Sequence, residues 1–124
     1  MAEVKRIPQW VMLEALRNNV TSMHLEKSDG TFTGAVGVGP TDFDISTQDY
    51  EPVLKLSIPE TLEVGVGDTI TDISLFIDGT NAPTVYDNSE DHKIRFPIGG
   101  VDGETFPDGG SIEVTDFEVY LNDL

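Results

Sequence analysis

Ile70-Thr71-Asp72-Ile73-Ser74-Leu75-Phe76-Ile77-Asp78 is the stretch that decides the fold, because residues 112–122 near the C-terminus repeat its pattern. A Lys-apolar-x-apolar-Pro segment precedes each copy, at residues 55–59 and again at residues 93–97, and a Gly-containing turn follows it. In both copies apolar and polar residues alternate after a Thr-Asp pair, which is the period of a β-strand with one buried face. A doubled strand, turn, strand unit predicts an antiparallel β domain.

Length and composition limit the remaining possibilities. A chain of 124 residues with 38% hydrophobic residues can bury one core, so we expect a single domain. The absence of cysteine excludes disulfides, thiolate metal sites and cysteine nucleophiles. No apolar run follows Lys5 and Arg6 as in a signal peptide, and no segment reaches the roughly 18 apolar residues of a membrane span. We therefore expect a protein that works in solution, without a membrane partner.

The charge is strongly negative and unevenly placed. Of the formal net charge of −16, residues 1–27 contribute +1 and the rest of the chain −17. An acidic body repels nucleic-acid phosphates, so no nucleic-acid partner is expected. The charge can serve solubility alone. Alternatively, the acidic body meets a basic partner and the N-terminus docks elsewhere, through four residues: Lys5, Arg6, Trp10 and Arg17.

One helix is predicted, close to the N-terminus. Pro8 suits a first helical turn, residues 9–19 contain no further Gly or Pro, and Trp10, Leu13 and Leu16 recur at helical spacing. A helix of about three turns is marginal alone. We expect it to lie against the sheet of its own domain; the alternative is that Trp10 faces a partner. Residues 1–7 form a predicted arm, and residues 8–124 a single β-sandwich domain.

The rest of the chain reads as short strands separated by turns. Strands are predicted at residues 20–26, 53–58, 60–66, 70–77, 84–86, 93–96 and 113–121, with an edge strand or long loop at 31–38. An irregular connection with one short extended piece is expected at residues 40–50, and a loop at residues 99–110. About eight short strands predict a mainly β, antiparallel sandwich of jelly-roll or immunoglobulin-like type. Its core candidates in the deciding stretch are Ile70, Ile73, Leu75 and Ile77, whereas Ser57 and Ser74 should face outward.

The chain contains little that predicts catalysis. His24 and His92 lie in no zinc-binding spacing, and no nucleophile motif occurs, so we expect neither an enzyme nor a metal or other cofactor. The acidic loop containing Asp87, Asn88, Glu90 and Asp91 is a weak candidate for an ion such as calcium. Turn chemistry and solvation are the simpler interpretation of that loop. Asp72 and Asp116, which match in the two copies, are each expected to bond nearby backbone.

The order of these elements resembles a known family. A short helix leads into a strand at residues 22–26, a strand ends at Pro59, a Gly-Asp turn enters residues 69–78, and a Gly-Gly turn enters the last strand. This pattern is similar to that of the small tail-fibre and appendage-attachment proteins of tailed bacteriophages, which are β-sandwich virion proteins.

The resemblance implies a non-enzymatic virion component, assembled in the host cytoplasm. Such a protein forms homo-oligomers and joins one particle component to another, so its partners are other virion structural proteins. Two alternatives remain open. One is a capsid decoration protein, and the other is a stand-alone β-sandwich module that binds a carbohydrate or cell-surface ligand.

Overall fold

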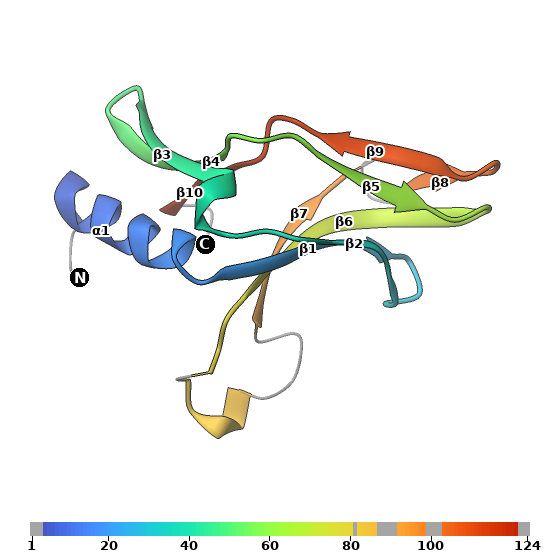
Figure 1. Cartoon of the computed structure of the whole chain (residues 1–124), viewed down its shortest axis with the longest axis horizontal. Helices are drawn as coiled ribbons and strands as arrows, with labels where there is room; N and C mark the ends of the chain where they lie inside the picture. Colours follow the sequence, from blue (N-terminus) through green and yellow to red (C-terminus); the bar gives the residue numbers. More distant parts are fainter. Residues whose placement is uncertain (1–3, 81, 87–91, 99–102, 122–124) are drawn as a thin grey trace.

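The computed structural model describes residues 4–80, 82–86, 92–98 and 103–121 and shows a mainly β chain in two layers (Figure 1). One layer contains helix α1 (Arg6–Arg17) and a five-stranded antiparallel sheet of β1 (Val20–Lys27), β2 (Phe32–Gly37), β6 (Asp68–Ile77), β7 (Lys93–Pro97) and β8 (Glu104–Phe106). The other contains β3 (Phe43–Gln48), β4 (Glu51–Leu56), β5 (Glu60–Val64), β9 (Gly110–Val114) and β10 (Glu118–Tyr120). The predicted antiparallel sandwich with one N-terminal helix is confirmed.

Strand β6 lies at the centre of the larger sheet. It pairs with β1 along one side and with β7 and β8 along the other. Of its four predicted core residues, Ile70, Ile73 and Leu75 are buried and Ile77 is partly buried against the same core. The alternation of β6 therefore predicted correctly which side chains fill the space between the layers.

Helix α1 begins earlier and ends earlier than predicted. It starts at Arg6, so Arg6 and Ile7, assigned above to the arm, belong to the helix. It ends because the N–H groups of Asn18 and Asn19 bond back to the last turn, and the Asn19 side chain donates to the Ala15 carbonyl at 2.7 Å. Leu13, which is fully buried, fixes the helix against the core.

The two copies of the repeated unit pair with each other. β6 of the first copy pairs with β7 of the second, and β4 pairs with β10. The single strand predicted at residues 113–121 is wrong, because the chain breaks between β9 and β10, which pair with β5 and β4 respectively. β4 and β5 are themselves separated by a short link that contains Pro59, a residue with no N–H to donate. The break between β9 and β10 therefore lies opposite the break between β4 and β5.

Three further segments differ from the prediction. Residues 84–86 form the 3₁₀ helix η2 (Thr84–Tyr86), not a strand. Residues 40–50 are more regular than expected and contain the 3₁₀ helix η1 (Pro40–Asp42) followed by the six-residue strand β3. Residues 99–110 include β8, so the described residues hold ten strands where about eight were predicted. These strands are short or rich in acids, and long-range pairing formed them where local pattern gave little signal.

The two matched aspartates have different surroundings. Asp72 lies within β6, where its carboxylate accepts a hydrogen bond of 2.8 Å from the Thr71 hydroxyl. Asp116 lies in the link between β9 and β10. The sequence match therefore does not give the two side chains equivalent positions.

Candidate docking surface

The face of α1 that points away from the domain carries several exposed apolar residues, with the exposed Glu14 on the same side. Ile7 is 78% exposed and Val11 58% exposed, and Val4 and Met12 are also exposed. At about 100° per residue, Ile7 and Val11 lie one turn apart on the side opposite the buried Leu13. We call Val4, Ile7, Val11 and Met12 the outer stripe of α1. Contiguous exposed apolar residues with a polar border mark interaction sites.

The four predicted docking residues all lie on or beside α1, but they do not share one exposure. Lys5 and Arg6 are both exposed. Lys5 precedes the first helical residue, and the Arg6 guanidinium donates to the Gln9 side chain over a long distance of 3.5 Å. Trp10 and Arg17 are partly buried on the inner side of the helix. The Arg17 Nε is buried and has no hydrogen-bond partner among the described residues. Lys5 and Arg6 therefore border the outer stripe, whereas Trp10 and Arg17 belong partly to the packing of the domain.

Sequence reasoning missed the outer stripe itself. Ile7 was assigned to the arm, and Val11 and Met12 were given no role. The i, i+4 spacing of Ile7 and Val11 was the available signal, because it places both on one helix face opposite Leu13. A helix apolar on two opposite sides has one side that its own domain does not cover.

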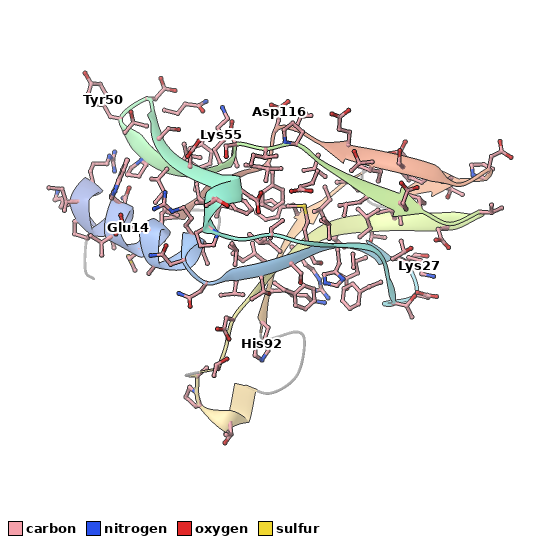
Figure 2. All side chains as sticks on the ribbon, viewed as in Figure 1. Glu14, Lys27, Tyr50, Lys55, His92 and Asp116 are labelled. Atoms are coloured by element: carbon pink, nitrogen blue, oxygen red, sulfur yellow. The ribbon has the colours of Figure 1, made fainter. Side chains whose placement is uncertain are left out.

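A second exposed feature lies at the tip of the β3–β4 hairpin. Asp49 and Tyr50 form the two-residue turn, with φ of 51° and 67°, and are the only described non-glycine residues with positive φ. Tyr50 is 89% exposed and points away from the body (Figure 2). Turns of this type favour Asn-Gly, because a side chain in the left-handed region costs roughly 1–2 kcal/mol. Strain at an exposed aromatic residue suggests a role outside the folded chain.

Replacing Tyr50 with glycine is expected to stabilise the isolated protein. The left-handed backbone at residue 50 no longer carries a side chain, and the free energy of unfolding should rise by about 1 kcal/mol. Urea denaturation at neutral pH measures the change. Tyr50→Phe is the matched control, since it keeps the strained side chain and should leave stability unchanged. A loss of stability in Tyr50→Gly would contradict the assignment of strain to this turn.

The surroundings of the hairpin are acidic. The Tyr120 hydroxyl donates to Glu118 Oε2 at 3.0 Å. Burial, this hydrogen bond and the negative charges of Glu118, Asp49 and Glu51 raise the pKa of Tyr120 above its ordinary value. This end of the molecule thus combines an exposed aromatic ring with several carboxylates.

The outer face of the five-stranded sheet carries an ionic cluster around the buried carboxylate of Glu26, with the Arg95 side chain 45% exposed. Glu26 Oε2 accepts from Arg95 Nε at 2.8 Å, and Glu26 Oε1 accepts from Arg95 Nη2 at 2.9 Å and from Lys93 Nζ at 3.3 Å. Ser74 Oγ donates to Glu26 Oε2 at 3.1 Å, and Ser74 is fully buried. Ser74 therefore faces away from the core, as predicted, but it is covered by these side chains, whereas Ser57 is exposed.

The long side chain of Lys93 covers part of this face. The Lys93 side chain is only 2% exposed and reaches over the Phe32 ring, with Nζ 4.8 Å from its centroid. Burial alone raises the pKa of Glu26, but hydrogen bonds from Arg95, Lys93 and Ser74 outweigh it, so the net pKa is lowered. The cluster holds a buried carboxylate in its charged form.

Beside this cluster, His24 lies in a pocket of aromatic rings. Its ring packs edge-on against Phe32 and Phe76, and its Nε2 lies 2.9 Å from Ser22 Oγ. Burial lowers the pKa of His24, so the imidazole is neutral at neutral pH. The ring contacts and the Ser22 hydrogen bond together account for its position in the strand.

Two clefts flank the chain where β6 ends. The larger, of about 730 Å³, is lined by Ser22, Phe76, Thr80 and His92 among others, and the smaller, of about 540 Å³, lies between α1 and the same segment. His92, expected to be solvated, is partly buried with its ring against Gly79. A side chain at residue 79 would collide with that ring, so this glycine is what allows the contact.

The described residues contain no group of three side chains suited to hold a metal ion. The predicted ion loop, with Asp87, Asn88, Glu90 and Asp91, lies outside the described residues. None of the described helices is long and apolar enough to cross a membrane. Comparisons with protein-family models, with curated proteins and with solved structures found no match.

Proposed function

We propose that this protein is a structural adapter that docks onto another component of a larger particle through the outer stripe of α1. The observation that carries the proposal is the exposure of Ile7 and Val11 on a helix whose opposite side is fixed by Leu13. A helix held in this way presents its apolar face without a folding cost on binding. Burying such a face in a groove is a common mode of helix recognition.

Charge defines the chemistry of the partner. The outer stripe is bordered by Lys5 and Arg6 in a chain whose net charge is −16. A partner groove with an apolar floor and an acidic rim complements this helix. Docking of this kind weakens as salt is added, because the pairs at the rim are exposed.

The particle that we propose is a tailed-bacteriophage virion, on the strength of the resemblance in element order. Within it the tail-fibre or appendage adapter is preferred, with a capsid decoration protein as the alternative. A second function has an observation of its own: Tyr50, exposed at a hairpin tip, suits a stand-alone β-sandwich module that stacks a ligand on this ring.

The double variant Ile7→Asp, Val11→Asp is expected to release the protein from its particle. Both side chains are exposed, so the substitutions should leave the melting temperature unchanged while placing charge in the apolar contact. The particle-bound fraction in a density gradient, after expression in the native background, should fall at least about tenfold. Surface substitutions test docking more sharply than removal of residues 1–7, which would also cut the first helical residues.

Val66→Asp is the matched control, since Val66 is as exposed as Ile7, at 78%, but lies in the turn between β5 and β6. It should sediment with particles like the unmodified chain. If the unmodified chain never sediments with particles, the adapter proposal fails. If ligand binding is instead lost in Tyr50→Ala and kept in the helix variant, the binding-module alternative is correct.

A further inference from the structure

We propose that β3 is the site at which a second copy of this chain adds edge to edge, in antiparallel orientation, about a twofold axis at Ser46. The pair would join the two β10-β4-β3 sheets into one continuous sheet. This interface is separate from the outer stripe of α1 and does not depend on the adapter function.

The hairpin register shows which main-chain groups of β3 are available. β3 is the outermost strand of its sheet, and β4 is its only partner among the described residues. Gln48 and Glu51 close the two-residue turn, so these two residues exchange main-chain hydrogen bonds. Because hydrogen-bonded pairs alternate along an antiparallel ladder, Ser46 and Asp44 also direct their N–H and C=O groups toward β4. Ile45 and Thr47 therefore direct their N–H and C=O groups outward, away from β4. Pro52, which lacks an N–H, lies opposite Thr47 in agreement with this assignment.

β3 lacks three of the features that usually protect an edge strand. Sheet edges are normally blocked by lysine, proline, bulges or a covering element. The sequence of β3 (Phe43–Gln48) contains neither lysine nor proline, its register with β4 shows no shift, and Asp44 is its only charged residue. One edge strand of the other sheet, β2, differs, since it is bulged and lies against β5 at Gly34. β3 is thus open to pairing where β2 is not.

The pattern of β3 is complementary to itself. With the axis at Ser46, Ile45 faces Thr47 of the second copy and Asp44 faces Gln48, so no acid lies opposite an acid. Direct opposition of like charges destabilises a strand pair, and this register avoids it. The same register brings Tyr50, 89% exposed in the single chain, to the level of Asp42, the last residue of η1, in the second copy.

Salt dependence separates this interface from docking through α1. Two chains of charge −16 repel one another, so pairing through β3 should strengthen as salt screens the repulsion. Docking of the basic helix onto an acidic rim should weaken under the same conditions. Failure of one proposal can therefore be told from failure of the other.

A cysteine at residue 46 tests the register directly, because the chain contains no other cysteine. In the proposed pair the two residues 46 form a non-hydrogen-bonded pair with Cα atoms about 4.5 Å apart, within the range of a disulfide. Mild oxidation should convert most of the Ser46→Cys protein to a covalent dimer. Asp44→Cys, exposed on the same face of β3, is the matched control, since its two copies would lie roughly 13 Å apart along the strands. Equal cross-linking of both variants would mean random collision and would overturn the proposal.

A second variant measures the contribution of the strand pairing. Thr47→Pro removes an outward N–H without removing a hydrogen bond to β4, and Thr47→Ala keeps that N–H. Sedimentation equilibrium at high salt should show a dimer for the unmodified protein and for Thr47→Ala. For Thr47→Pro the dissociation constant of the dimer should rise at least about tenfold. A monomer for the unmodified protein at every salt concentration, with no covalent Ser46→Cys dimer, would refute the interface.

Discussion

Glu26→Gln is expected to lower the free energy of unfolding by about 3–5 kcal/mol, the range observed when one partner of a buried ion pair is removed. The Glu26 carboxylate accepts hydrogen bonds from Arg95, Lys93 and Ser74, and its side chain is only 6% exposed. The substitution takes away the negative charge that compensates the Lys93 ammonium, itself 2% exposed. Urea denaturation monitored by the fluorescence of the single tryptophan gives the difference.

Glu63→Gln is the control for this measurement. Glu63 is exposed on β5, and its substitution should change stability by no more than about 0.5 kcal/mol. A loss for Glu26→Gln as small as that of the control would show that the cluster is no more stabilising than a surface ion pair, worth about 0–1 kcal/mol.

The pH dependence of the same pair of proteins provides an independent check. Because the pKa of Glu26 is lower in the folded chain than its ordinary value of 4.5, the charged form favours folding. That contribution is complete above the ordinary pKa and is lost as the pH falls below it, through the folded value. The stability difference between the unmodified protein and Glu26→Gln should therefore be constant near neutral pH and shrink below about pH 4.5. A difference that grows in acid would contradict the direction of the shift.

The sequence predicted those parts of the fold in which local pattern and long-range pairing agree. The alternation of β6 identified Ile70, Ile73 and Leu75 as core residues, and the spacing around Leu13 predicted α1. These segments fill the core, so their period follows from burial. The break between β9 and β10 could not be predicted, because it depends on which strands face residues 115–117.

The candidate surfaces were harder to predict, for two physical reasons. Alternation shows which side chains share a face of a strand but not what covers that face. Ser74 is buried because Lys93, distant in sequence, extends across the sheet toward Glu26. The outer stripe of α1 consists of the same residue types as its inner face, so composition could not separate Ile7 from Leu13. Exposure in the folded chain was needed to distinguish them.

Gly34→Ala is the second substitution with a large expected effect, and it concerns how the two layers are held together at their edge. Gly34 has φ of 62°, and it lies in β2 where the register with β1 shifts, so that residues 34 and 35 face the single residue His24. This is a β-bulge with glycine in the left-handed region at its first position. A Cβ at residue 34 would lie 2.6 Å from the Glu63 carbonyl oxygen of β5, which is backbone and cannot rotate away.

Two costs therefore add at this position. The left-handed conformation costs roughly 1–2 kcal/mol for alanine, and forcing the layers apart costs about 1–3 kcal/mol, so Gly34→Ala should destabilise by about 2–5 kcal/mol. Gly37→Ala in the same strand is the matched control, because nothing lies within 4 Å of its Cβ position and its φ is not positive. The control should be neutral to within about 0.5 kcal/mol. Equal effects of the two substitutions would show that β2 and β5 do not pack closely, and the layers would then be held together by the core alone.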